Sequence, residues 1–168
     1  TVDSSQNTTF ANKLATTNLG TGAVLQVKNF QTGAFAEGTT AIPFDDTIPQ
    51  ITEGTEFMTL AITPTASTSK LFIQVVLNGS GHTTGDMITA LFVGTTADAL
   101  AVADDYDVSR GQMIINYYMT AGTTSELTFR VRAGRSTAEA FYFNGYHDSN
   151  PLFGGTLMSS ITITEIGG

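Results

Sequence analysis

The chain has 168 residues and a formal net charge of −8, which argues against nucleic-acid binding because that function needs clustered Lys and Arg side chains for phosphate contacts. It contains no cysteine, which excludes disulfides and thiolate metal sites, and it has no apolar run long enough to insert into a membrane. Charged residues make up 13% of the chain, about half of the usual ~25%, so we expect a neutral surface that favours a subunit of an assembly.

The chain begins with a polar stretch, residues 1–22, in which the only apolar spacing is the helical pair Phe10 and Leu14. We expect an extended or briefly helical lead-in there, as at the end of a stalk or in a linker. The pattern changes at Ala23, where residues 23–29 alternate as in a strand. The sequence therefore predicts one domain over residues 23–168, and its next strand at residues 39–44.

The pattern is clearest in residues 56–78, which predict a strand, a short loop and a returning strand. In the returning strand one face is apolar at every second position, at Leu71, Ile73, Val75 and Leu77. The opposite face carries Phe72 and Val76. A strand that is apolar on both faces is either central in a two-layer sandwich or covered by another chain.

Further strands are predicted at residues 87–93, 112–120, 126–133, 140–146 and 157–166. Between the first two of these, residues 94–111 favour a long surface loop with a single helical turn at residues 98–103. Arg130 and Arg132 share an outward face, where solvated or ion-paired side chains are expected. The total of about nine short strands without a long amphipathic helix predicts an all-β, antiparallel, jelly-roll-like β-sandwich.

Residues for catalysis are scarce. The chain has two histidines, His82 and His147, and each lies in a sequence typical of a surface loop. The sequence contains none of the common hydrolase, zinc-protease, P-loop or dinucleotide-binding motifs. We therefore expect a protein that is not an enzyme.

The best candidate for a metal site is the acidic group Asp104, Asp105 and Asp107, since oxygen ligands this close in sequence can wrap around Ca²⁺ where the backbone turns. The Gly and the distant Glu of an EF-hand loop are missing. Calcium is the only cofactor that the sequence suggests.

Aromatic side chains suggest a ligand site. Tyr142, Tyr146, His147 and Phe153 lie close in sequence near a loop, and an exposed ring can stack on the apolar face of a sugar. Packing in the core or in an interface is the competing explanation, and the absence of Trp supports it.

Two segments carry a resemblance to a known family. Residues 44–73 resemble the strand-loop-strand block, and residues 154–168 the closing strand, of C-terminal β-sandwich domains of phage tail-fibre and other virion fibre proteins. The resemblance implies a homotrimer at a fibre tip or virion surface, with the lead-in toward the shaft and the doubly apolar strands at the three-fold interface. It supplies no fixed set of binding residues.

The first hypothesis is accordingly a homotrimeric virion fibre-tip or surface-appendage domain that contacts other virion proteins and attaches to a host glycan or protein. The second is a monomeric, secreted carbohydrate-binding module. The third is a capsid decoration protein without a ligand. The virion is the expected location under the first and third hypotheses.

Overall fold

The computed structural model describes residues 20–83, 85–107, 110–147 and 150–168, so most of the predicted lead-in, including Phe10 and Leu14, lies outside the described residues. The described part is built of strands with one short 3-10 segment, which confirms the all-β prediction. The elements are β1 (Val24–Thr32), β2 (Ala36–Gly38), β3 (Thr55–Ile62), β4 (Lys70–Gly81), β5 (Gly85–Val93), β6 (Ala101–Asp107), β7 (Arg110–Thr120), β8 (Leu127–Arg135), β9 (Phe141–Phe143), β10 (Gly145–Tyr146), β11 (Asn150–Pro151), η2 (Leu152–Gly155) and β12 (Ser159–Ile166). No helix in this part is long and apolar enough to cross a membrane.

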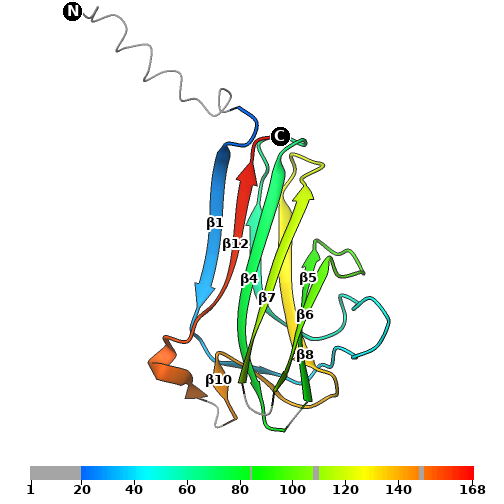
Figure 1. Cartoon of the computed structure of the whole chain (residues 1–168), viewed down its shortest axis with the longest axis vertical. Helices are drawn as coiled ribbons and strands as arrows, with labels where there is room; N and C mark the ends of the chain where they lie inside the picture. The colour runs from blue at the N-terminus through cyan, green and yellow to red at the C-terminus, as the bar shows by residue number, and fades with distance from the viewer. Residues whose placement is uncertain (1–19, 84, 108–109, 148–149) are drawn as a thin grey trace, which may run out of the picture.

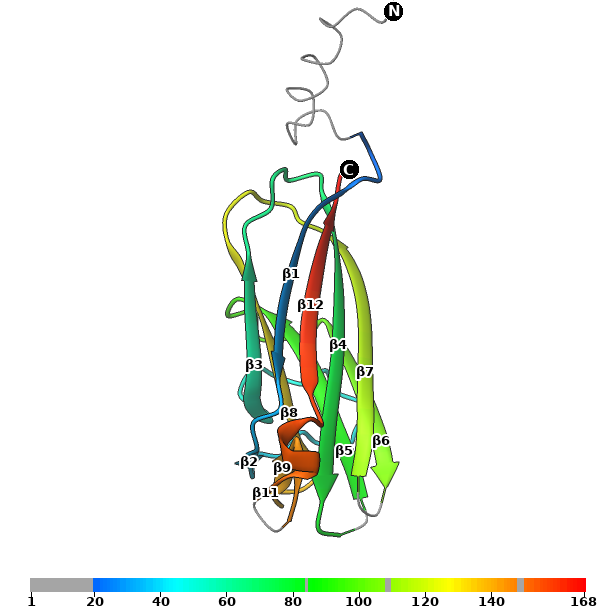
Figure 2. The ribbon, with the colours of Figure 1, turned by 90° about the vertical axis from the view of Figure 1, so that its left-hand side faces the viewer.

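The strands form two layered antiparallel sheets (Figures 1 and 2). The larger sheet has the order β1-β12-β4-β9-β2, and β7 pairs with β4. The smaller sheet has the order β3-β8-β5-β6. β10 and β11 pair only with each other and form a separate two-stranded sheet at one end of the sandwich. The described chain begins beside its C-terminus, where Gly22 N–H donates to the Gly167 carbonyl oxygen (2.7 Å), whereas η2 lies at the opposite end of the sandwich (Figure 2).

The core lies between the two sheets. The predicted inward face of β4 is fully buried at Leu71, Ile73, Val75 and Leu77, and it meets the buried residues Phe129 and Val131 of β8. Burial of each such side chain contributes roughly 1.5–3 kcal/mol, so this face carries much of the fold's stability. The inward positions Ile161 and Ile163 of the closing strand are confirmed as well.

A second, smaller core lies on the outer face of the smaller sheet. There Ile88, Ala90 and Phe92 of β5 are covered by Ile42 from the segment between β2 and β3. Residues 39–44 were expected to form a strand, which is wrong, because the paired segment is the shorter β2 immediately before them. The apolar residue Ile42 reflects this covering role and not membership of a sheet.

The expected long loop over residues 94–111 is also wrong, since its second half contains β6, which pairs with β5 along its length. Aspartate is depleted in strands, so Asp104 and Asp105 weakened the strand signal in the sequence. The strand is at the edge of its sheet, where charged side chains are tolerated.

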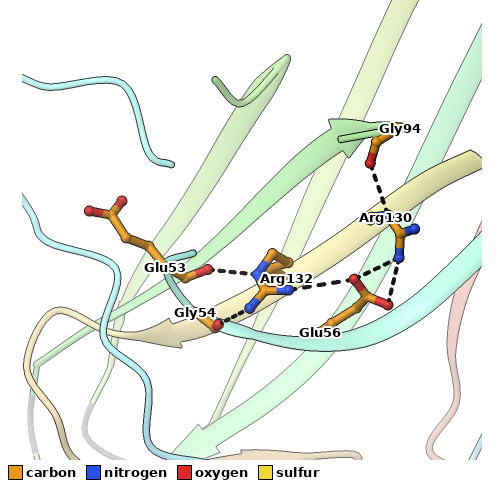
Figure 3. A network of polar contacts seen from close by, with 6 residues as sticks. All are labelled: Glu53, Gly54, Glu56, Gly94, Arg130 and Arg132. Carbon is orange, nitrogen blue, oxygen red and sulfur yellow. Dashed lines mark hydrogen bonds and ion pairs between the residues drawn. The ribbon is translucent and has the colours of Figure 1, made fainter. Parts of the chain in front are cut away.

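The cluster of arginines on β8 holds loops against the smaller sheet (Figure 3). Arg132 donates to the carbonyl oxygens of Glu53 (Nε, 2.8 Å) and Gly54 (2.7 Å). Arg130 donates to the Gly94 carbonyl oxygen (3.0 Å) and pairs with Glu56 at 3.1 Å. These contacts match the expectation of ion-paired positions and give both arginines a structural role.

Candidate functional site

A hollow of about 320 Å³ opens at the η2 end of the molecule. We name it the Phe153 hollow. Its lining comes from β4, β6, β7 and the segment that leads into β12, and it consists of Asn78, Gly79, Asp105, Arg110, Gly111, Gln112, Phe153 and Leu157. The hollow thus combines one aromatic ring with two amides, a guanidinium group and a carboxylate.

Phe153 is the most exposed large apolar side chain of the described residues, at 71%. Its backbone is left-handed (φ 50°, ψ 38°), a conformation that costs a bulky residue on the order of 1–3 kcal/mol. The next two residues, Gly154 (φ 66°) and Gly155 (φ 85°), continue the tight turn, and Thr156 Oγ1 donates to the Phe153 carbonyl oxygen (2.8 Å). Backbone strain that projects an apolar ring into solvent does not help folding, which points to a functional role for the ring.

Hydrogen bonds fix the two amides of the hollow. Gln112 Nε2 on β7 donates to Asn78 Oδ1 on β4 (3.0 Å), and Asn78 Nδ2 donates to the Met158 carbonyl oxygen (2.8 Å). The Asn78 backbone N–H donates to Ser159 Oγ (2.9 Å), whose hydroxyl in turn donates to Asn144 Oδ1 (2.6 Å). The polar wall of the hollow is therefore preorganised by a buried network.

Two lining residues of the hollow, Gly79 and Gly111, are paired across β4 and β7. A Cβ atom on Gly111 would collide with the Asp105 carboxylate, and one on Gly79 would collide with the ring of Phe141. The missing side chain of Gly111 leaves room for Asp105, which reaches the hollow from the other sheet, whereas that of Gly79 leaves room for the buried Phe141 ring. Arg110 is exposed, and it has no carboxylate within ion-pair distance among the described residues, so its guanidinium is available to a ligand.

The other predicted aromatic residues lie outside this hollow. Tyr142 is half-buried and stacks against Phe35, with ring centroids 6.3 Å apart. The rings of Tyr146 and His147 are in contact, with centroids 4.2 Å apart, and the His147 ring also meets the His82 ring edge-on, with centroids 4.7 Å apart. Of the four aromatic candidates, the structure brings only Phe153 to the hollow.

The acidic candidates are separated. The turn expected around Asp104 and Asp105 is a strand, so these neighbours point to opposite faces of the sheet, and Asp107 ends that strand with a side chain outside the described residues. Asp104 is opposite Ile88 of the outer face, and Asp105 is opposite Met87 of the core. No group of three or more His, Asp or Glu side chains in the described residues could hold a metal. The turn that the calcium hypothesis assumed at Asp104 and Asp105 is therefore wrong, while the part of the hypothesis that depends on the Asp107 side chain lies outside the described residues.

Sequence reasoning missed Asn78, Arg110 and Gln112. Asn78 and Gln112 become neighbours only through the pairing of β4 with β7, in which Asn78 is opposite Gln112 and Ser80 is opposite Arg110. The sequence offered no distinct signal, because β4 and β7 carry a second polar pair, Gln74 and Asn116, that lies outside the hollow.

No family model and no curated protein matches the chain. Similar solved structures include the carbohydrate-binding module CBM36 in complex with calcium and xylotriose, with a TM-score of 0.41 and 9% identity over 81% of this chain and 98% of that one. The CBM35 module of Abf62 from Cellvibrio japonicus has a TM-score of 0.42 and 11% identity over 85% and 99%. Eiger TNF from S. frugiperda has a TM-score of 0.43 and 8% identity over 84% and 93%. At TM-scores below 0.5 these similarities carry no argument for a family or a ligand.

Proposed function

We propose that this chain is a non-catalytic carbohydrate-binding domain whose sugar site is the Phe153 hollow. The observation that carries the proposal is the exposed Phe153 ring, held in a strained backbone beside fixed planar polar groups. A sugar ring has an apolar face that can stack on an aromatic ring and hydroxyl groups at its edge. The amides of Asn78 and Gln112 and the carboxylate of Asp105 offer the donors and acceptors that such hydroxyls need.

Titration calorimetry with soluble oligosaccharides, among them xylohexaose, cellohexaose and sialyllactose, tests this proposal. We expect at least one of them to bind, and Phe153→Ala to weaken that binding about tenfold through loss of the stacked ring. Phe44→Ala is the matched control, since Phe44 is also an exposed phenylalanine (65%) but lies outside the hollow. Equal losses in the two variants, or no binding across a wide glycan array, would refute the proposal.

A homotrimeric virion appendage is the second candidate, and glycan binding would then serve attachment to a host surface. It draws support from the position of η2, which carries Phe153 of the hollow and lies at the opposite end of the sandwich from the described N-terminal residues and the C-terminus (Figure 1). A domain joined to a fibre through either of these ends would present the hollow outward. The chain would then be part of the virion particle, whereas the carbohydrate-binding module alone would be secreted.

The outer face of the larger sheet supports the same candidate. Register places Val27, Thr164, Phe72 and Tyr118 in one row across β1, β12, β4 and β7. A nearby row joins Val76 to Ile114. Val27, Tyr118 and Ile114 are 55%, 57% and 52% exposed, so a neighbouring subunit could bury these apolar side chains together with the polar pair Gln74 and Asn116 that lies between the two rows.

Light scattering coupled to size exclusion tests this candidate. We expect the mass of three chains for the wild type and the mass of one chain for the double variant Ile114→Lys/Tyr118→Lys, because a buried charge without a partner disrupts an apolar interface. Thr124→Lys, in an exposed loop, is the control. A wild-type monomer at high concentration would leave the carbohydrate-binding proposal standing and would remove the trimer.

A further inference from the structure

A second hollow lies on the outer face of the smaller sheet, away from the Phe153 hollow. Its volume is about 210 Å³, and it is lined by Pro43, Phe44, Asp45, Thr47, Pro49, Ile88, Val102 and Asp104. Buried Ile88 and half-exposed Val102 come from β5 and β6, while the prolines and Phe44 come from the segment between β2 and β3. We name it the Asp104 hollow.

The shape suits one long side chain. A volume of about 210 Å³ is too small for a folded element and ample for one extended side chain. Most of the lining is apolar, and the exposed ring of Phe44 adds to it. An unbranched aliphatic stem would therefore replace water along much of its length.

The polar part of the lining is anionic. Asp45 and Asp104 both line the hollow, and none of the described residues around it is basic. Asp45 is held in place by Thr47, whose backbone N–H (2.8 Å) and hydroxyl (2.6 Å) both donate to Asp45 Oδ1, so Oδ2 remains free for a ligand. These hydrogen bonds lower the pKa of Asp45 and keep it ionised. Asp104 is exposed and has no ion pair among the described residues.

We propose that the Asp104 hollow accepts a lysine or arginine side chain of a partner protein, with the stem on Phe44 and Val102 and the cationic head between Asp45 and Asp104. Charge complementarity selects this occupant over an apolar one, because an apolar side chain would leave two carboxylates beside it without a counter-charge. The site lies on a different sheet from the Phe153 hollow, so the inference does not depend on carbohydrate binding.

The test titrates blocked amino acids into the intact chain as probes. Their binding is monitored through the backbone amide chemical shifts in NMR spectra. Nα-acetyl-lysine methylamide and Nα-acetyl-arginine methylamide are expected to shift the amides of residues 44–48, 88 and 102–104 saturably, with a dissociation constant on the order of 1 mM. Nα-acetyl-norleucine methylamide has an apolar stem without a charge and is expected to cause no saturable shift.

Variants decide whether the carboxylates matter. Asp104→Asn and Asp45→Asn should each weaken binding of the lysine probe about two- to fivefold, as expected for exposed ion pairs. At high salt, the decrease in affinity that each substitution causes should be smaller, because the ions screen the charges. Glu126→Gln, which removes the same charge from an exposed loop, should leave the affinity unchanged. Equal binding of the norleucine probe, unchanged affinity in both Asp variants, or no saturable shift with any probe would each overturn the proposal.

Discussion

Gln112 and Asn78 face each other across β7 and β4, joined by a 3.0 Å hydrogen bond from Gln112 Nε2 to Asn78 Oδ1, and both line the hollow beside Phe153. The Asn78 side chain is also tied to the Met158 carbonyl oxygen just before β12. The amide groups therefore keep their orientation without a ligand. A binding site with fixed polar groups loses less side-chain entropy when a ligand is bound.

Phe153→Gly should stabilise the fold relative to Phe153→Ala, because glycine adopts the left-handed backbone (φ 50°) without strain and alanine does not. We expect a difference in the free energy of unfolding of about 1 kcal/mol, measured by urea denaturation. Both variants should weaken oligosaccharide binding about tenfold, because both lack the stacked ring. Equal stability of the two variants would show that the backbone at this position is not strained.

Gly79→Ala should destabilise the fold by about 1–3 kcal/mol, since the added methyl group would collide with the buried ring of Phe141. Thermal unfolding measures the effect. Gly20→Ala is a suitable control because open space surrounds that position. A Gly79→Ala protein as stable as the wild type would mean that the Phe141 ring can move aside.

Arg132→Ala should destabilise the fold more than Glu56→Gln does. Arg132 donates to two backbone carbonyl oxygens at 2.8 and 2.7 Å, which would lose these partners in the alanine variant, and we expect a cost of about 1–3 kcal/mol. The contacts of Glu56 among the described residues are partly exposed ion pairs, which contribute at most about 1 kcal/mol. Urea denaturation of both variants checks the order, and the reverse order would contradict the structural role given to Arg132.

Glu165 should make stability depend on acidic pH. Its side chain is buried, and burial alone raises its pKa, but hydrogen bonds from Thr65 (2.6 and 2.7 Å) and Gln26 (2.6 Å) outweigh burial and hold the pKa below the ordinary 4.5. Since the unfolded chain binds the proton more tightly, this contribution is complete above pH 4.5 and is lost as the pH falls through the folded pKa.

Glu165→Gln should therefore cost about 1.5–3 kcal/mol at neutral pH and less in acid, as measured by denaturation between pH 3 and 7. Glu126→Gln is the control, since Glu126 is exposed. A constant difference between wild type and Glu165→Gln across this pH range would contradict the assigned pKa shift.

The sequence was sufficient to predict the parts of the fold where side chains alternate. Leu71, Ile73, Val75 and Leu77 repeat with period two because one face of β4 is buried, and that repeat is visible without a structure. β6 was missed because the pattern of its aspartates resembles that of a loop, and an edge strand has no need of a strong apolar repeat. Ile42 was assigned to a strand because burial under a loop and burial in a sheet leave the same apolar signature.

The candidate site was predictable only in part, for a related reason. Phe153 was noticed as an aromatic residue among turn-forming residues, but its left-handed backbone depends on tertiary packing that no local pattern reports. Asn78 and Gln112 are separated by 34 positions, and only strand register brings them together. Tyr142 shows the opposite error, since nearness in sequence to Phe153 did not bring it to the same place.

Asp104 and Asp105 are consecutive residues, yet they line different hollows. Asp104 lines the Asp104 hollow on the outer face of the smaller sheet, and Asp105, on the opposite face, lines the Phe153 hollow. Deletion of one residue just before them would shift the register of β6 by one position and exchange the faces to which the two carboxylates point. A single frame-preserving deletion could thus disable two separate surfaces of the molecule, whereas a point substitution at either aspartate would change only one of them.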